Sequence, residues 1–276
     1  MSSASGTLAP SRAGVAVRVG FAAYVLALVG LPLAALVAQG LRGGLSGVWR
    51  VVSAPVAAHA LWLTFWTAAL MAVVNAVMGT AAAWVLVRYR FPGRAALSAL
   101  IDLPFAVPTL VAGVLLTVLL GPQSDLGGWL GRHGVRVIFA PPSIVLVLLF
   151  VTLPFVVRAV EPVLLELDPA EEEAAWLLGA GPVTTFTRVV LPALAPAILS
   201  GTIRSFARAL AEFGSVVVVA GNIPHRTLTA PVFIFGEVES GRPGDAAAAS
   251  VVLLVASVLL LVAARQAERL TGRDRG

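Results

Sequence analysis

Long apolar runs, separated by short segments rich in glycine or arginine, make up most of this chain. A helix needs about 20 mainly apolar residues to cross a bilayer. Six runs are near or above that length, at about residues 19–38, 60–87, 99–120, 143–160, 196–220 and 246–264. The pattern predicts an all-α integral membrane protein with six transmembrane helices, embedded in the lipid bilayer.

The arginines give these spans an orientation. Segments that stay in the cytoplasm carry an excess of basic residues. With both termini inside, eleven arginines fall on the cytoplasmic side and six on the outer side, leaving aside the two within the fifth span. The densest cluster, RYRFPGR at 88–94, then lies in the cytoplasm. We therefore expect a multi-pass protein of the cell (inner or plasma) membrane whose N- and C-termini are both cytoplasmic.

The same pattern divides the chain into four parts. Residues 1–16 are small and polar, and are expected to form a disordered cytoplasmic N-terminus. Residues 17–58 hold the first transmembrane helix and an external loop, 59–265 form the main transmembrane domain, and 266–276 form a cytoplasmic tail. A cleaved signal peptide has an apolar core of only about 7 to 15 residues, so the longer first run is interpreted as an uncleaved span.

Composition narrows the chemistry. The chain of 276 residues is 59% hydrophobic and only 12% charged, roughly half the charge of an average soluble domain. It has no cysteine, and its nineteen basic residues are all arginine. Without a lysine it has no P-loop, so it cannot be that kind of ATPase. Its three histidines are isolated in the sequence. Its net charge is +5, and the charged residues are concentrated at the predicted edges of the membrane. We expect no catalytic residue, metal, cofactor or nucleic-acid partner.

The segment 168–192 interrupts the apolar pattern between the fourth and fifth spans. Asp168 and Pro169 suit the N-cap and first position of a helix, and acids follow in its first turn. Gly179 is expected to end this helix. Beyond an Ala-Gly-Pro turn, apolar residues recur every three or four positions until Pro192, which is expected to close the segment. The pattern predicts a cytoplasmic helix-turn-helix, with an ordinary solvated loop as the alternative.

The fifth span carries three ionisable residues. Arg204, Arg208 and Glu212 recur every four residues, so on one continuous helix they share a face. Ionisable groups at membrane depth are costly and generally face a bundle interior or an aqueous path. Two roles stay open. Arg208 and Glu212 form a buried pair that locks the helix, or the three residues lie beside the path of a solute.

Polar residues and prolines also interrupt the second and third spans. The third contains Asp102, Pro104 and Pro108, so its first turns are expected to be kinked or irregular. Irregular backbone at membrane depth is tolerated only against protein or a water-filled cavity. This span is therefore expected to face protein or to line such a cavity. In the second span, Asn75 either bonds a neighbouring helix or serves the pathway, and the first role is favoured.

A motif runs through the 168–192 loop. The order EAA-x3-G-x9-V-x-LP begins at residue 173 and ends at residue 192. It resembles the EAA loop of type I ATP-binding-cassette importer permeases, EAA-x3-G-x9-I-x-LP, with valine in place of isoleucine. The resemblance implies the MetI-like permease fold and a cytoplasmic coupling helix that docks into a groove of an ATPase subunit. The coupling residues would be Glu173, Ala174, Ala175, Gly179, Val189, Leu191 and Pro192.

Four further segments resemble the T-type permease subunits of sulfate and thiosulfate importers. They are RYRFPGR at 88–94, DLPFAVPT at 102–109, LPFVVRAVEPVL at 153–164 and FARALAEFGSVVVVAGNIP at 206–224. Molybdate permeases share the AEFGS and GNIP parts, whereas the first two segments favour sulfate. The sequence GEVE at 236–239 departs from the KLEQ-like stretch of the sulfate subunits. The candidates for the translocation pathway are Arg204, Arg208, Glu212, Asn222 and Asp102.

The resemblance implies a larger assembly. This chain would form half of the translocation pathway, and a second homologous permease subunit would form the other half. Two ATPase subunits would bind ATP and Mg²⁺ on the cytoplasmic side, and an extracytoplasmic sulfate-binding protein would deliver the solute. A molybdate or tungstate importer permease is the nearest alternative. A stand-alone secondary anion transporter, driven by a proton through Glu212 and Arg208, is an alternative of another class, and the lack of a clear internal repeat disfavours it.

Overall fold

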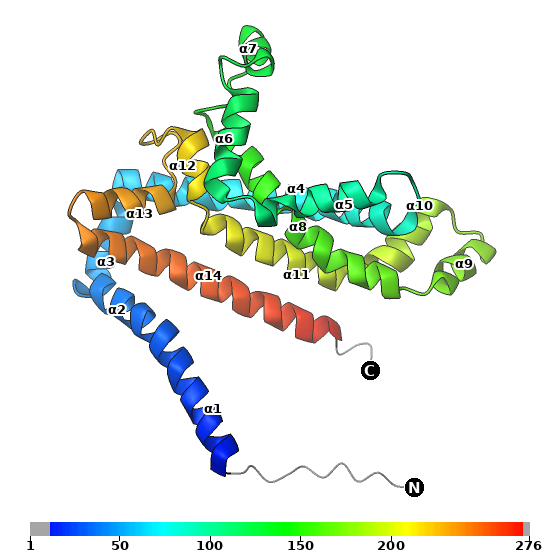
Figure 1. Ribbon diagram of the computed structural model, residues 1–276, viewed down its shortest axis with the longest axis horizontal. Helices are drawn as coiled ribbons and strands as arrows, with labels where there is room; N and C mark the ends of the chain where they lie inside the picture. The colour runs from blue at the N-terminus through cyan, green and yellow to red at the C-terminus, as the bar shows by residue number, and fades with distance from the viewer. Residues whose placement is uncertain (1–11, 273–276) are drawn as a thin grey trace.

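The computed structural model describes residues 12–272, and every regular element within them is a helix. Four long helices run alongside one another in Figure 1, namely α4 (Pro55–Arg88), α8 (Pro141–Glu166), α11 (Leu191–Leu210) and α14 (Pro243–Gly272). Helix α11 contacts the other three. Residues 1–11, which hold most of the expected disordered N-terminus, and residues 273–276 of the tail lie outside the described part.

Within residues 12–272, five helical segments are long and apolar enough to cross a membrane. They cover Gly14–Gly40, Pro55–Arg88, Pro141–Glu166, Pro182–Leu210 and Pro243–Ala263. The helices α5 (Arg94–Ala106) and α6 (Thr109–Leu120) make a sixth span only if this bent pair counts as one. Helices are therefore found at the predicted spans, with the third bent, as expected, and the fifth not continuous.

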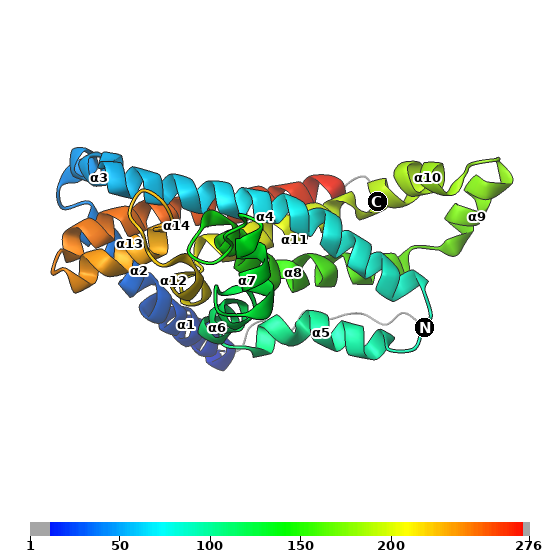
Figure 2. The same ribbon diagram turned by 90° about the horizontal axis from the view of Figure 1, so that it is seen from above.

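The predicted third span is two helices that meet at 116°. The break falls at Val107, whose backbone is extended, and at Pro108, one of the residues from which an irregular backbone was predicted. A residue that precedes proline is disfavoured in helical conformation, which ends α5 before Pro108. Pro104 instead lies inside α5. Helix α5 packs on α8, whereas α6 leaves the side of the bundle and leads to α7 (Asp125–Arg132) (Figures 1 and 2).

The predicted fifth span is also broken. Helix α11 ends at Leu210, and α12 (Gly214–Ala220) begins after a short irregular segment, so the continuous helix expected over 196–220 is wrong. The Glu212 carboxylate accepts hydrogen bonds from the backbone N–H of Ser215 at 2.9 Å and from its Oγ at 2.8 Å. A side chain that bonds nearby backbone groups in this way competes with helix continuation. Helix α12 then packs along α6.

The first span begins with α1 (Arg12–Val25), continues through a π-helical turn, Leu26–Gly30, and ends with α2 (Leu31–Gly40). Helix α2 contacts α14, while α1 diverges from the bundle (Figure 1). Two short helices, α3 (Gly44–Ser53) and α13 (Ala230–Glu239), lie at one end of the bundle. The opposite end carries α9 (Pro169–Leu177) and α10 (Pro182–Thr185).

Close helix packing centres on Val156 of α8, which is fully buried. A Cβ atom on Gly79 of α4 would lie 2.7 Å from Val156 Cβ, and one on Gly201 of α11 would lie 2.9 Å from Val156 Cα. Small residues at these positions let three helices approach closely, as in membrane helix interfaces. One turn from Gly79, Asn75 Nδ2 donates to Thr152 Oγ1 at 2.8 Å, the interhelical bond that the sequence favoured.

Candidate functional site

The helix-turn-helix predicted at 168–192 lies at one end of the bundle (Figure 1). The Asp168 carboxylate accepts a hydrogen bond from the N–H of Ala170 at 2.9 Å and caps α9, with Pro169 as its first residue. Gly179, at φ +87°, turns the chain after α9. This left-handed conformation favours glycine because it has no Cβ. The alternative of an ordinary solvated loop is therefore wrong.

Pro192 does not close this loop, in contrast to the prediction. Helix α10, a π-helical turn at Phe186–Val190 and α11 follow one another without a break, and Pro192 is the second residue of α11. Proline has no N–H to bond a carbonyl one turn earlier, and a π-helical turn is a common local adjustment of this kind. The 168–192 loop is thereby joined directly to the fifth span, so a displacement of the loop acts on α11.

The predicted coupling residues occupy the surface of this end. Glu173, Ala174 and Gly179 are exposed at α9 and the following turn, and Ala175 is half-buried. The rest of the motif lies on the continuing helix, where Val189 is half-buried and Leu191 and Pro192 are exposed. The motif residues therefore form no enclosed pocket. They present a surface whose small side chains allow close contact with another molecule.

An apolar edge beside the motif was missed by the sequence reasoning. The side chains of Leu177 and Leu178 are each 89% exposed, and Trp176 and Val183 are also exposed. The consecutive apolar residues just before Gly179 were the signal that could have revealed it, since a helix ending in water rarely places two leucines there without a partner. We define the apolar edge as Trp176, Leu177, Leu178 and Val183.

Two residues at the end of α4 hold the loop in place. Arg88 forms an ion pair with Glu172 of α9, and its guanidinium lies 5.5 Å from the ring centre of Trp84. Trp84 meets Phe186 edge to face, with ring centres 5.3 Å apart. The side chains of both Arg88 and Glu172 are mostly buried, so this pair is less screened by solvent than a surface pair. The contacts tie α9 and the π-helical turn to the second span.

Asp102 belongs to a charged cluster between α5 and α8. Its Oδ1 accepts a hydrogen bond from Arg158 Nε at 2.7 Å. Arg158 also pairs with Glu161 and donates from Nη2 to Ser98 Oγ at 2.8 Å. A guanidinium offers five donors in a planar fork, which suits several acceptors at once. The cluster holds the first half of the bent third span against the bundle.

The break of the fifth span is also a charged site. Arg208 Nη2 lies 2.7 Å from Glu212 Oε2, and the Glu212 side chain is almost completely buried. Glu212 therefore uses one oxygen for Arg208 and the other for Ser215. Of the two roles left open, the buried pair is present in this structure. Arg204 lies one turn earlier, on an exposed face of α11.

The candidate pathway residues thus occupy three separate places. Asp102 lies between α5 and α8, and Arg208 and Glu212 lie at the break between α11 and α12. Asn222 is exposed in the loop that follows α12, with a left-handed backbone at φ +53°. The two broken helices approach each other, since a Cβ on Gly113 of α6 would lie 2.6 Å from the carbonyl oxygen of Ser215.

Comparison with known proteins assigns this chain to a protein family. The family described as "Binding-protein-dependent transport system inner membrane component" matches residues 75–272. The chain belongs to this family and is a transporter permease subunit of a multi-pass inner-membrane type. The resemblance to importer permeases proposed from the EAA motif is therefore confirmed.

Relatives of known name cover most of the chain. It is 44% identical over 239 residues to the "Probable sulfate transport system permease protein cysT" of Nephroselmis olivacea, covering 86% of this chain and 84% of the relative. It is 41% identical over 250 residues to the "Sulfate transport system permease protein CysT" of Escherichia coli (strain K12), covering 91% of this chain and 90% of the relative. The resemblance to T-type sulfate permeases is thus confirmed at the level of sequence similarity.

Solved structures share the fold. A chain of a bacterial alginate ABC transporter, in complex with an alginate-bound periplasmic protein, aligns with a TM-score of 0.76 at 18% identity and covers 93% of this chain and 94% of its own length. A chain of the MetNI methionine ABC transporter, in an inward-facing conformation, aligns with a TM-score of 0.57 at 18% identity. The alignment covers 77% of this chain and 94% of the length of that chain. The predicted type I importer permease fold is confirmed.

Proposed function

We propose that this chain is the permease subunit of an ATP-driven importer of sulfate and thiosulfate. The observation that carries the proposal is the identity of 41–44% to named sulfate permeases over most of the chain. In this role it forms half of the pathway, beside a second permease subunit. Two partner ATPases hydrolyse ATP, and an extracytoplasmic binding protein delivers the solute. Both termini then face the cytoplasm.

The 168–192 loop couples the chain to a partner ATPase in this proposal. The exposed Leu177 and Leu178 supply the apolar contact, because burying apolar surface on association is favourable. Glu173, Ala174 and Ala175 border that contact. Movement of α9 reaches the second span through the Arg88–Glu172 pair. It reaches the fifth span through the continuous helix that follows α10. Two membrane helices therefore move with one docked loop.

The broken helices form this chain's share of the pathway in the proposal. One break falls at Val107 and Pro108 and the other includes Glu212. Non-helical backbone at membrane depth needs protein or a water-filled cavity as its neighbour. The Arg208–Glu212 pair lies at one of the breaks. A permease must release its solute, so a paired arginine that offers only a weak field to a passing anion suits the task better than a tight cage.

Transport in a defined background tests the proposal. The chain is produced with its partner subunits in a strain that lacks sulfate uptake, and import of radiolabelled sulfate is measured with thiosulfate, molybdate and tungstate as competitors. We expect ATP-dependent sulfate import that thiosulfate inhibits and molybdate does not. Preferential import of molybdate or tungstate would assign the other substrate. Uptake by the purified chain alone in liposomes, driven by a proton gradient without ATP, would assign a secondary transporter.

A further inference from the structure

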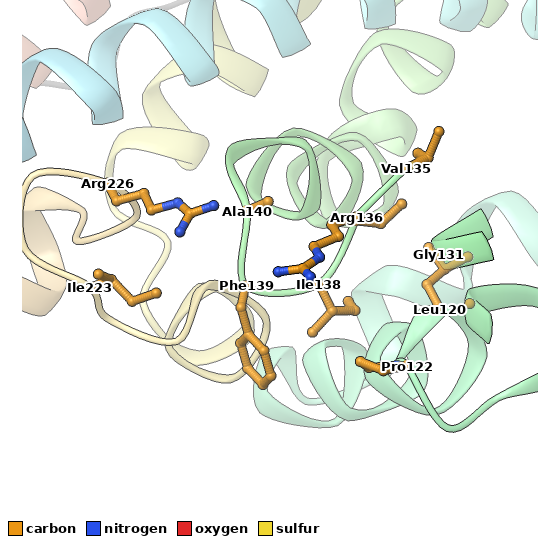
Figure 3. Close-up of a pocket in the computed structure, with 12 residues that line it drawn as sticks. Leu120, Pro122, Gly131, Val135, Arg136, Ile138, Phe139, Ala140, Ile223 and Arg226 are labelled. Carbon is orange, nitrogen blue, oxygen red and sulfur yellow. The ribbon is translucent and has the colours of Figure 1, made fainter. Parts of the chain in front are cut away.

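A cavity of about 510 Å³ lies between the loop that precedes α8 and the loop that follows α12. Two arginines line it, Arg136 from the first loop and Arg226 from the second, and no carboxylate does. Figure 3 shows their side chains extending toward each other from opposite sides of the cavity. None of the functional residues predicted from the sequence lines it. Two exposed arginines from distant parts of the chain therefore line one open cavity.

These two arginines differ from three arginines of the long helices α4, α8 and α11. Arg88, Arg158 and Arg208 each have a carboxylate partner. Within residues 12–272, the Arg136 and Arg226 side chains form no ion pair. A guanidinium carries its charge at any physiological pH and presents donors in a fork that matches the oxygens of an oxyanion. The cavity thus offers charge and donors that the chain itself does not satisfy.

The backbone around the cavity is unusual. In the described part of the chain, three non-glycine residues have positive φ: Phe139 at +61°, Asn222 at +53° and His225 at +57°. Phe139 lines the cavity, and the other two flank the lining residues Ile223 and Arg226. Such conformations are uncommon outside glycine, above all for a bulky residue, and they cluster at functional sites. The strained backbone of both loops coincides with the unpaired arginines.

Hydrogen bonds hold this backbone in place. The N–H of Phe139 donates to the carbonyl of Val219 at 2.9 Å, which joins the first loop to the end of α12. The N–H of Ile223 donates to Oγ1 of the fully buried Thr227 at 3.1 Å. A Cβ on Gly221 would lie 2.7 Å from the Phe139 ring, so the loops are in close contact. The two arginines are therefore presented from a fixed frame.

We propose that this cavity is an outer receiving site for a tetrahedral oxyanion with two negative charges, such as sulfate. The proposal rests on the function proposed above and adds a site that lies apart from Arg204, Arg208 and Glu212. The predicted topology places both loops on the outer side of the membrane. The cavity is bordered by Leu120 at the end of α6 and by the loop after α12. An anion held there stands at the far ends of both broken helices.

The size of the cavity indicates loose binding. A water molecule takes up about 30 Å³ of liquid, so about 510 Å³ holds a small anion together with much of its hydration shell. Two arginines then act largely through water-mediated contacts and a local field. Such a site captures an anion released by a delivery protein and gives it up again. A fully dehydrated, tightly coordinated ion would be retained instead.

The absence of cysteine from the natural sequence allows a direct binding test. Val135 lines the cavity and is exposed, so Val135→Cys in the full-length chain in native membranes places one thiol there. Leu126→Cys, on the exposed face of α7 and outside the cavity lining, is the matched control. The rate of labelling by an anionic thiol reagent is measured with sodium sulfate and with sodium chloride at equal ionic strength.

We expect sulfate to slow labelling of Val135→Cys at least about threefold relative to chloride, and to leave Leu126→Cys unchanged. Adding Arg136→Gln and Arg226→Gln is expected to remove the protection, because the cavity then has no positive charge. Equal labelling rates in sulfate and chloride, or equal protection at Leu126, would overturn the proposed site. Since this readout needs no transport, protection without sulfate import would reject the proposed function while leaving the site in place.

Transport by the assembled complex provides the second test. Arg136→Gln with Arg226→Gln is expected to lower sulfate import at least about tenfold while the binding protein still docks on the complex. Arg132→Gln changes an exposed arginine of the same segment that does not line the cavity, and import is expected to stay within about twofold. Loss of docking in parallel with import would overturn the proposal and assign the cavity to acidic side chains of the delivery protein. Unchanged import would overturn it as well.

Discussion

Charge is used in opposite ways at two regions of this molecule. At the end that carries the 168–192 loop, Arg88 is paired with Glu172, and between α5 and α8, Arg158 is paired with Asp102 and Glu161. In the cavity near α12, Arg136 and Arg226 face each other without a carboxylate in the lining. Paired charges fix one element against another, whereas unpaired charges attract a ligand. In this comparison, the paired arginines hold elements together, whereas the two cavity arginines keep their charge and donors for a solute, as proposed above.

The largest effect on assembly and import is expected at the apolar edge of the 168–192 loop, where the proposed ATPase subunit docks. Leu178→Asp places a carboxylate on the apolar edge, and burying that charge against an ATPase costs at least about 3 kcal/mol, or roughly a hundredfold in affinity. Co-purification of the ATPase and sulfate import are both expected to be lost. Leu178→Met keeps an apolar side chain of similar volume and is the control. An ATPase that still co-purifies with Leu178→Asp at wild-type level would exclude the apolar edge as the docking surface.

A smaller effect is expected from removing the centre of a charged cluster. Arg158→Ala leaves Asp102 and Glu161 without their guanidinium, in a site that is only partly exposed. We expect a loss of about 2 kcal/mol, between the values for exposed and buried pairs. Thermal unfolding of the detergent-solubilised chain measures it. The exposed Arg132→Ala serves as control, and equal melting temperatures for both variants would show that the cluster contributes no stability.

The pair that braces the loop is expected to affect transport more than stability. Glu172→Gln removes the charge that Arg88 meets, so movement of α9 is transmitted less completely to α4. We expect import to fall about three- to fivefold with the ATPase still bound. Glu171→Gln, at an exposed neighbour in the same helical turn, is expected to have no effect. If the two variants behave alike, the Arg88–Glu172 pair has no coupling role.

The smallest effect is expected at an ion pair of the opposite end. Arg242 Nη2 lies 2.9 Å from Glu237 Oε1, and this hydrogen bond lowers the pKa of Glu237. A lowered pKa in the folded state adds stability above the pKa of the unfolded chain, and that stability is lost as pH falls through the folded value. Melting temperature is expected to drop on acidification by roughly 1–2 °C more in the wild type than in Glu237→Gln. Identical pH profiles would contradict this.

The sequence predicted the long elements and the loop because their signals are local. Apolar length located the spans, and Asp168, Pro169 and Gly179 located α9 and its end. The positions of the breaks depended on tertiary contacts. Pro108 and Glu212 were both noticed, but whether a span bends at such a residue depends on the helix that packs beside it. The cavity could not be predicted, because Arg136 and Arg226 are 90 residues apart and are joined only by the folded loops.

The two glycines that flank Val156 have a mechanical consequence. With Gly79 on one side and Gly201 on the other, Val156 packs closely against both neighbouring helices, so sliding or rotating α8 would disturb two tight contacts. The three helices should therefore tilt as one rigid block when the loop at their end is displaced. The helix breaks at 107–108 and 211–213 are then the joints about which neighbouring segments can move. A swing of α6 and α12 about these joints can open or close a passage while the hydrophobic core stays intact.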